Sequence, residues 1–397
     1  MPAYKSFIIG GGLTGDAACR GIRSVDPSGT IGMISQEIHP PYSRPALSKG
    51  LWRKKKLERI WQNTAALGVE IQLGRTITEL DLANKRAIDD QQTEYTFEKL
   101  LLATGGSPRR LPFDNQDVVY FRTLVDYERL RKLSDERQNF LVIGGGFIGS
   151  EIAASLAIHD KKVTIVFPEE GIGGRVFPKA MSLFLNDYFR QKGVEVVSAS
   201  RITGIETRGS ATLVKIQDQA KGVERELTTD VVVAGVGIQP NLELAKAAGL
   251  EVENGIVVDE ALVTSHPDVY AAGDVANFYS TVLKQRMRVE HEDNAQTMGM
   301  TAGKNMAGEH ILYTHLPYFY SDLFDLGYEA VGELNSQKEI VAEWKEMYQK
   351  GILYYLSGSQ VRGVLLWNVW SQIDNARRVI ADPGPFTPTD LLNKIPM

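Results

Sequence analysis

The sequence contains one cysteine, Cys19, among 397 residues, and it has no apolar run long enough to cross a membrane as a helix. A lone cysteine excludes an internal disulfide and any cysteine-cluster metal or iron–sulfur centre. The six histidines are scattered, and His291-Glu292-Asp293 lacks the helical spacing of a ligand set, so we expect no metal site. These absences predict a protein without a membrane span, and we place it in a reducing compartment, the cytoplasm.

An excess of either charge is also missing. The chain has 44 Lys and Arg residues against 49 Asp and Glu residues, which gives a formal net charge of −5. No general affinity for nucleic acid follows from that balance. The length predicts two or three domains. Because the N-terminus leads directly into an apolar strand, we expect no signal or transit peptide.

Glycine, in contrast, occurs in one pattern that the chain carries twice, about 134 residues apart. The copies read Phe7-Ile8-Ile9-Gly10-Gly11-Gly12-Leu13-Thr14-Gly15 and Leu141-Val142-Ile143-Gly144-Gly145-Gly146-Phe147-Ile148-Gly149. Each copy follows a short apolar strand and opens a helical pattern, over residues 13–24 and 147–158. This context is typical of dinucleotide-binding sites. Two such sites in one chain predict two dinucleotides and electron transfer between them.

The three glycines of each copy have different tasks. The first, Gly10 or Gly144, allows a sharp turn off the strand. The second, Gly12 or Gly146, lets the backbone approach a pyrophosphate, and the third, Gly15 or Gly149, lets the helix pack closely on the strand. The helix N-terminus then presents N–H groups and a positive dipole end to the phosphates.

An acid follows the second strand of each unit, at the distance expected for a ribose 2′-OH acceptor. Glu37 lies 22 residues past Gly15, and Glu169 lies 20 residues past Gly149. An acid at this position repels the 2′-phosphate of NADPH, so Glu169 predicts a preference for NADH. Arg175 lies nearby and leaves NADPH as the less favoured alternative.

The two glycine units end in similar strands, at residues 100–104 and 231–235, and Gly237 after the second strand is assigned to the second nucleotide site. We therefore predict an α/β protein with two Rossmann-like domains, the second inserted into the first, followed by a C-terminal α+β domain. The expected boundaries are 1–115 with 240–312, then 116–239, then 313–397. In the last domain we expect three to five antiparallel strands, among them 328–334, 338–346, 351–357 and 361–369, and a helix near Ser371–Ile380. We assign this domain to an interface, with a homodimer as one outcome.

Further motifs show a family resemblance. They are Pro41-Tyr42-Ser43-Arg44-Pro45-Ala46-Leu47-Ser48-Lys49, Phe121-Arg122-Thr123, Ala272-Gly273-Asp274, Arg288-Val289-Glu290-His291-Glu292-Asp293, Phe167-Pro168-Glu169-Glu170-Gly171, Gly327-Tyr328-Glu329-Ala330-Val331-Gly332 and Val364-Leu365-Leu366-Trp367-Asn368. Together with the glycine signatures they resemble the FAD-dependent pyridine nucleotide-disulphide oxidoreductases of the ferredoxin-reductase type. The last three of these motifs bring the chain nearest to apoptosis-inducing factor and its prokaryotic relatives.

The resemblance implies a set of cofactor contacts. The FAD contacts are Gly10, Gly12, Gly15, Arg44, Lys49, Arg122 and Asp274, with Tyr320 against the flavin. The NADH contacts are Gly144, Gly146, Gly149, Glu169 and Arg175, with Phe147 near the nicotinamide and Glu290 at its amide. At the position of the family's first ribose acid this chain has Gln36, so Glu37 replaces that acid only in part.

The resemblance also implies that Lys49 pairs with Glu151 beside the reactive N5 of the flavin. A cation there stabilises the negative charge that builds on the reduced flavin. His291 has two interpretations, an active-site proton carrier or a residue with a local hydrogen-bonding role. Cys19 is expected to be a buried small hydrophobe, which disfavours thiol catalysis.

Two functions are compatible with these features. In the first, the protein oxidises NADH and passes electrons to a ferredoxin-like iron–sulfur protein, a quinone or another oxidant. In the second, it is a slow reductase whose NADH-bound charge-transfer state acts as a redox or oligomerisation signal. The run Trp52-Arg53-Lys54-Lys55-Lys56 is either a docking site for a small acidic redox protein or a solvated loop. The active-site insertion of animal apoptosis-inducing factor is missing at 343–350, and we do not carry over a DNA-binding role.

Overall fold

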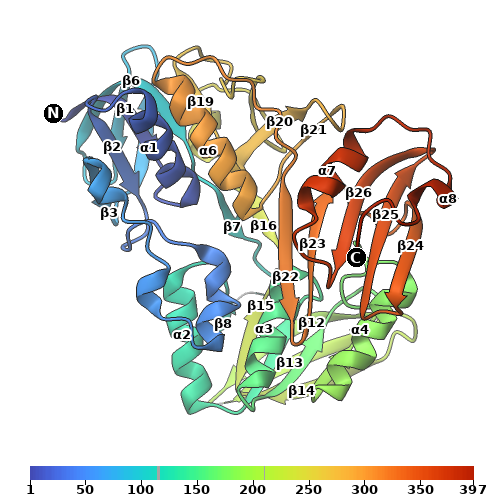
Figure 1. Cartoon of the computed structure of the whole chain (residues 1–397). Helices are drawn as coiled ribbons and strands as arrows, with labels where there is room; N and C mark the ends of the chain where they lie inside the picture. The colour runs from blue at the N-terminus through green and yellow to red at the C-terminus, as the bar shows by residue number, and fades with distance from the viewer. Residues whose placement is uncertain (114–116, 210) are drawn as a thin grey trace. The chain divides into compact units, whose positions relative to one another are not determined.

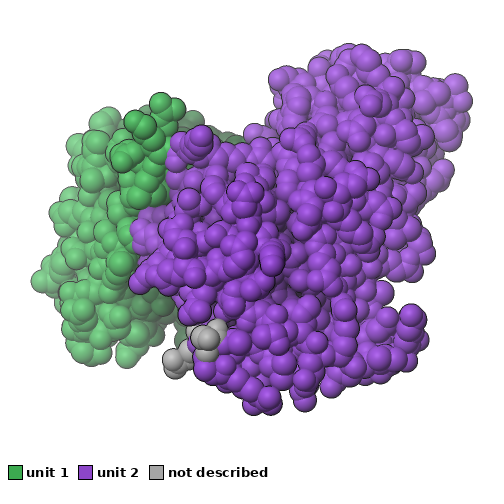
Figure 2. Space-filling model, turned by 90° about the horizontal axis from the view of Figure 1, so that it is seen from below, with its two compact units in different colours: residues 1–44, 56–107, 239–317 green, residues 45–55, 108–238, 318–397 purple. Residues whose placement is uncertain are grey.

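The computed structural model describes residues 1–113, 117–209 and 211–397. They form two compact units, which Figure 2 shows in different colours. Unit 1 consists of Met1–Arg44, Lys56–Ser107 and Gln239–Pro317, and unit 2 consists of Pro45–Lys55, Pro108–Ile238 and Tyr318–Met397. Each unit is therefore built from segments that are far apart in the sequence.

Unit 1 is built on a sheet with the strand order β3-β2-β1-β6-β5-β4, in which β19 also pairs with β6 (Figure 1). Its strands are β1 (Ala3–Ile9), β2 (Ile31–Ser35), β3 (Val69–Leu73), β4 (Ile77–Asp81), β5 (Arg86–Asp89), β6 (Glu94–Leu102) and β19 (Val269–Ala271). A smaller sheet contains β17 (Val252–Glu253), β18 (Gly255–Val257), β20 (Ala276–Ser280) and β21 (Gln285–Met287). The helices are α1 (Leu13–Val25), α5 (Glu243–Ala247) and α6 (Glu292–Met306).

The parallel strands β1, β2, β6 and β19 form the centre of unit 1. All five residues of β2 are buried, as expected for a strand covered on both faces. Helices α1 and α6 pack at close range because glycines remove side chains from their contact. A Cβ at Gly303 would lie 2.1 Å from the carbonyl oxygen of Ala18, and one at Gly299 would lie 2.4 Å from that of Thr14.

Cys19 lies on α1 within this core and is fully buried. Burial raises the pKa of its thiol far above the usual range, so the reactive thiolate is not populated at neutral pH. The expectation of an inert, buried small hydrophobe at this position is confirmed.

Unit 2 contains three sheets (Figure 1). The first is parallel and has the order β11-β10-β9-β15-β8, with β8 (Val118–Tyr120), β9 (Asn139–Ile143), β10 (Lys162–Val166), β11 (Val194–Val197) and β15 (Val231–Ala234). The second is antiparallel and joins β12 (Ser200–Arg208), β13 (Ala211–Asp218) and β14 (Glu224–Thr229). Helices α2 (Leu124–Glu136), α3 (Phe147–Ile158) and α4 (Lys179–Gln191) belong to the same part of the chain. Two short strands lie where the chain passes between the units, β7 (Gly106–Pro108) and β16 (Ile238–Pro240).

The third sheet of unit 2 is antiparallel, with the order β22-β23-β26-β25-β24. Its strands are β22 (Tyr318–Leu323), β23 (Leu326–Gly332), β24 (Glu339–Glu346), β25 (Lys350–Ser357) and β26 (Gln360–Trp367), followed by α7 (Ile373–Ala381) and α8 (Pro388–Leu391). Four of these strands and α7 fall where the sequence pattern places them. The pattern does not indicate β22.

The predicted fold class is confirmed: two Rossmann-like sheets and a C-terminal antiparallel sheet with a helix are present. The predicted helices at 13–24 and 147–158 correspond to α1 and α3. The division into three domains stays a prediction. Within residues 1–113, 117–209 and 211–397, no helix is both long and apolar enough to cross a membrane.

An ion-pair cluster in unit 1 generates a prediction about acid stability. The Asp268 carboxylate lies 2.7 Å from Lys85 Nζ and 2.5 Å from Lys99 Nζ, and it precedes β19. Hydrogen bonds from Lys85 and then Lys99 lower the pKa of Asp268 to about 2. Because the folded pKa is depressed, this stabilisation is complete above the ordinary carboxylate pKa of ~4 and is lost as the pH falls through about 2.

We therefore expect Asp268→Asn to lower the free energy of unfolding by about 1 kcal/mol at pH 7, a value reduced for partial solvent exposure. The difference from the wild type should shrink as the pH approaches about 2. Thermal or urea unfolding at several pH values measures it, with the exposed Glu98→Gln as the control. An equal loss of unfolding free energy at every pH would contradict the lowered pKa assigned to Asp268.

Candidate functional site

Both glycine turns adopt the same backbone geometry. Gly10 has a φ of 128° and Gly144 a φ of 112°, a region that side-chain-bearing residues rarely adopt. Gly12 is the N-cap of α1 and Gly146 is the N-cap of α3, and in the described part of the chain no side chain caps either helix. The first N–H groups of these helices are thus left for a ligand, and the helix dipole favours an anion there.

The second and third glycines of each copy differ in their surroundings. An added Cβ at Gly12 would have only Arg44 Nη2 nearby, at 3.9 Å, and one at Gly146 would meet no described heavy atom within 4 Å. An added Cβ at Gly15 or Gly149 would instead lie 2.2 Å or 1.9 Å from the carbonyl oxygen of the first glycine in its copy. Gly12 and Gly146 therefore keep space open at a helix N-terminus, which fits a pyrophosphate, whereas Gly15 and Gly149 hold the helix close to the strand.

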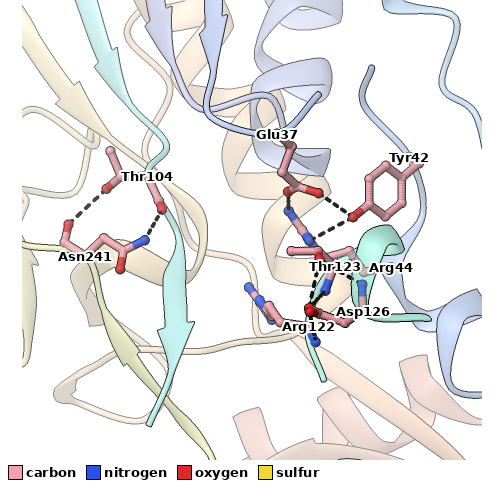
Figure 3. Close-up of polar contacts among 8 residues, drawn as sticks. All are labelled: Glu37, Tyr42, Arg44, Thr104, Arg122, Thr123, Asp126 and Asn241. Atoms are coloured by element: carbon pink, nitrogen blue, oxygen red, sulfur yellow. Dashed lines mark hydrogen bonds and ion pairs between the residues drawn. The ribbon is translucent and has the colours of Figure 1, made fainter. Parts of the chain in front are cut away.

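In unit 1, Glu37 follows β2 and takes part in a polar cluster that Figure 3 shows. Its carboxylate accepts a hydrogen bond of 2.5 Å from the Tyr42 hydroxyl and forms an ion pair with Arg44. Gln36, the residue before it, is exposed. The Glu37 carboxylate is thus held by Tyr42 and Arg44, and its contact with the FAD ribose stays a prediction.

In unit 2, Glu169 follows β10 at the corresponding place. Its carboxylate lies 2.5 Å from Nε of Arg175, whose side chain is 81% exposed. Arg175, which would favour a 2′-phosphate, is thus paired with the acid that disfavours it. This pairing is compatible with the predicted preference for NADH.

Arg122 lies between β8 and α2 in unit 2. Thr123 and Asp126 form a capping box at the start of α2, and Asp126 Oδ2 also accepts from the Arg122 backbone N–H at 3.0 Å (Figure 3). The local backbone is therefore fixed by the helix cap. Gly237 in the same unit has a φ of 89°, and its carbonyl accepts from the Arg109 N–H at 2.9 Å.

Asp274, Glu290 and His291 belong to unit 1. Arg288 connects the first two, because its Nη1 donates to the Asp274 carbonyl at 3.0 Å and lies 2.7 Å from a Glu290 carboxylate oxygen. His291 is the N-cap of α6. Desolvation by burial lowers the pKa of His291 to about 4, so its imidazole is neutral at pH 7. Proton transfer and a local hydrogen-bonding role both remain interpretations of this residue.

The Lys49–Glu151 ion pair is present in unit 2. Lys49 Nζ lies 2.8 Å from Glu151 Oε1, and the Glu151 side chain is only 2% exposed. Two hydroxyls also donate to this carboxylate, Ser48 Oγ to Oε2 at 2.6 Å and Ser321 Oγ to Oε1 at 2.5 Å. Lys49 Nζ lies 5.0 Å from the centre of the Tyr320 ring. A carboxylate, an ammonium and an aromatic ring are thus gathered at one place.

One stripe of α3 builds this cluster. Phe147, Glu151 and Ser155 are spaced by four residues, so they lie on the same helix face. The Phe147 ring lies 5.0 Å from the Phe319 ring on β22, and Ser155 Oγ donates to the Ser48 carbonyl at 2.8 Å. Phe319 and Ser321 alternate along β22 and face the same side. One turn of α3 therefore spans about the same distance as two residues of β22. Phe147 contacts Phe319, and one turn later Glu151 contacts Ser321.

The sequence did not single out Ser48, Ser321 or Tyr42 as site residues. Ser48 directly precedes Lys49, which is a signal that could have been used. Nothing local marks Ser321, since it lies 170 positions from Glu151. These hydroxyls bind carboxylates that the sequence did identify.

The segment 52–56 begins with a buried tryptophan and continues with exposed basic residues. Trp52 is only 2% exposed, and its Nε1 donates to the Leu47 carbonyl at 2.8 Å. Arg53 is exposed and donates to the Phe324 carbonyl at 2.7 Å, and Lys54, Lys55 and Lys56 are exposed as well. In the part of the chain that the structure describes, no group of three or more His, Cys, Asp or Glu residues could hold a metal ion.

Two parts of the chain match models of known protein families. Residues 4–299 match the family model of pyridine nucleotide-disulphide oxidoreductases. Residues 335–382 match the model of the C-terminal region of mitochondrion-associated apoptosis-inducing factor.

Individual relatives cover nearly the whole chain. The mitochondrial apoptosis-inducing factor 1 of Dictyostelium discoideum is 33% identical over 419 residues, which cover 95% of this chain and 78% of the relative. Monodehydroascorbate reductase 3 of Arabidopsis thaliana is 33% identical over 402 residues, which cover 92% of this chain and 89% of the relative. The crystal structure of the covalent putidaredoxin reductase–putidaredoxin complex superposes with a TM-score of 0.88 at 29% identity, covering 97% of this chain and 95% of the other.

The different surroundings of Gly146 and Gly149 give a paired prediction. Gly146→Ala should leave folding nearly unchanged, because its Cβ enters open space, but it should weaken dinucleotide binding about tenfold by blocking the close approach of a phosphate. Gly149→Ala should destabilise the protein by about 1–3 kcal/mol, because its Cβ meets backbone. Thermal unfolding and NADH titration measure the two effects. Equal behaviour of both variants would contradict the division of roles.

Proposed function

This chain belongs to the pyridine nucleotide-disulphide oxidoreductase family, and we propose that it oxidises NADH and delivers the electrons to a small acidic iron–sulfur protein. It is an FAD-dependent oxidoreductase that uses NADH. Disulfide reduction does not suit this member, because its single cysteine is buried in the core of unit 1.

One observation carries the proposal, which is the duplicated helix N-terminus with open space in front of it. Unit 1 offers one such cradle at Gly12 and unit 2 offers another at Gly146. Two cradles fit two dinucleotides, and Glu37 and Glu169 follow them at the sequence spacing expected of an acceptor for a ribose 2′-OH. When bound, the two cofactors supply the redox chemistry, which is hydride transfer from nicotinamide to flavin.

We assign residues to the cofactors as follows. The proposed FAD contacts are Gly10, Gly12, Gly15, Glu37, Arg44, Lys49, Arg122, Asp274 and Tyr320. The proposed NADH contacts are Gly144, Gly146, Phe147, Gly149, Glu169, Arg175 and Gly237, with Glu290 at the amide. His291 keeps its two interpretations.

Lys49 is proposed to supply positive charge where the electrons arrive. Its side chain is only 12% exposed, and its ammonium is held by the buried Glu151 carboxylate. A fixed cation in a site of low dielectric stabilises developing negative charge without reorganising solvent. Glu151 therefore orients the cation rather than acting on the substrate itself.

A protein acceptor is supported by two features. The chain is similar over 97% of its length to a reductase that was crystallised with putidaredoxin. The exposed Lys54 and Lys55 of unit 2 offer positive charge, and opposite charges accelerate the encounter of proteins. We also propose a cytoplasmic location, which the lone, buried cysteine favours.

A second function is favoured by the C-terminal match to apoptosis-inducing factor at residues 335–382. In this alternative the protein is a slow NADH oxidoreductase whose reduced, NAD⁺-bound form signals through a partner or a change of oligomeric state. The two functions differ in the fate of the electrons.

Anaerobic stopped-flow absorption separates the two functions. The purified flavoprotein is reduced with one equivalent of NADH and then mixed with a [2Fe–2S] ferredoxin, a quinone or no acceptor. We expect reoxidation by the ferredoxin at least about tenfold faster than by the quinone, because charge steering accelerates a protein encounter. A long-lived charge-transfer absorption that no acceptor shortens would contradict the proposal and support the signalling function.

The paired Glu169 and Arg175 give a prediction about cofactor choice. Glu169→Arg should weaken NADH binding about tenfold or more, because a charged hydrogen-bond acceptor is lost, and should favour NADPH relative to NADH. Steady-state KM values for both nucleotides measure this change. The neighbouring Glu170→Arg is the control, since the Glu170 side chain is 62% exposed and pairs with Lys179. An unchanged preference in Glu169→Arg would remove this residue from the ribose site.

A further inference from the structure

The Glu151 carboxylate is bound by more groups than an ion pair requires. Lys49 supplies one donor, and the hydroxyls of Ser48 and Ser321 supply two more. Both serines are almost completely buried, Ser48 at 2% exposure and Ser321 at 1%. A hydroxyl in such a place needs a partner of its own, and here both partners are oxygens of the same carboxylate.

The two serines bind different oxygens of the Glu151 carboxylate. Ser48 binds Oε2, whereas Ser321 and Lys49 share Oε1. A carboxylate bound at both oxygens cannot rotate without breaking a charge-assisted hydrogen bond. The direction in which Oε1 faces Lys49 is therefore set by hydroxyls that lie on two different segments.

Those segments are themselves fixed to α3. The Ser48 carbonyl accepts from Ser155 Oγ at 2.8 Å, one turn further along the helix than Glu151. The Phe319 ring, two residues before Ser321, lies 5.0 Å from the Phe147 ring, one turn earlier. The serine hydroxyls are thus held from both sides along a single helix face.

We infer that Ser321 and Ser48 are positioning residues that clamp the Glu151 carboxylate and so hold the Lys49 ammonium in place for hydride transfer. The inference rests on the proposed function, since hydride transfer is what gives the placement of Lys49 its purpose. Neither serine acts on the substrate. Each determines where the cation lies, which is how supporting hydrogen bonds keep reacting groups in productive geometry.

The test uses the purified flavoprotein and the variants Ser321→Ala, Ser48→Ala and Ser321→Thr. Ser321→Thr keeps the hydroxyl and is the conservative rescue. Ser134→Ala is the matched control, because Ser134 is a buried serine of α2 whose hydroxyl donates to the Arg131 carbonyl at 2.6 Å. Two readouts are recorded for each protein.

The first readout is lysine acetylation by a soluble active ester, followed by mass spectrometry. We expect the labelling rate of Lys49 relative to Lys54 and Lys55 to rise about fivefold in Ser321→Ala and in Ser48→Ala, because one clamping hydrogen bond is lost. The ratio should stay at the wild-type value in Ser134→Ala and return toward it in Ser321→Thr. This measurement does not depend on NADH, so it tests the clamp even if the proposed function fails.

The second readout is the limiting rate of flavin reduction by NADH, measured in an anaerobic stopped-flow instrument. We expect this rate to fall about fivefold in either alanine variant, whereas the NADH concentration at half saturation changes less than about twofold. A wild-type labelling ratio and a wild-type rate in both alanine variants would overturn the inference. So would a rise in labelling shared equally by Lys49, Lys54 and Lys55, because that result indicates general loosening of the unit.

Discussion

A buried carboxylate is costly unless it is paired and hydrogen-bonded, and Glu151 meets that requirement in unit 2. Its three donors come from the 45–55 segment and from β22, while Glu151 itself lies on α3. The contact therefore joins three parts of the chain at one point. The placement of Lys49, and with it the proposed chemistry, depends on this single carboxylate being held.

The glycines of the two repeated glycine motifs have two opposite structural roles. Gly149 is needed because backbone lies directly against it, so its role is to let α3 pack on the sheet. Gly146 is needed because nothing in the described structure lies near it, so its role concerns a ligand. The same residue type thus supports the fold at one position and the site at another, three residues apart. The corresponding pair in unit 1, Gly15 and Gly12, shows the same contrast.

The chain keeps the cofactor framework of its family and lacks the family's disulfide chemistry. Cys19 lies in the core of unit 1 and carries a thiol whose pKa burial raises, so electrons have no thiol to reach. The proposed acceptor is therefore a separate molecule. Residues 4–299 match the oxidoreductase family, and residues 335–382 match the C-terminal region of apoptosis-inducing factor.

The sequence alone determined the features that are contiguous along the chain. The glycine turns, the helices that follow them and the acids near residue 37 and residue 169 could be read directly, because a phosphate cradle is built from one strand, one turn and one helix. The C-terminal strands followed from their alternation, except β22, whose Tyr318–Leu323 segment has no clear period. The tertiary structure alone decided which hydroxyls bind Glu151, since Ser48 and Ser321 lie 103 and 170 positions away from it. Contacts between residues so far apart in the sequence form only when the face of one helix packs against a distant segment. The local sequence of neither element indicates that packing.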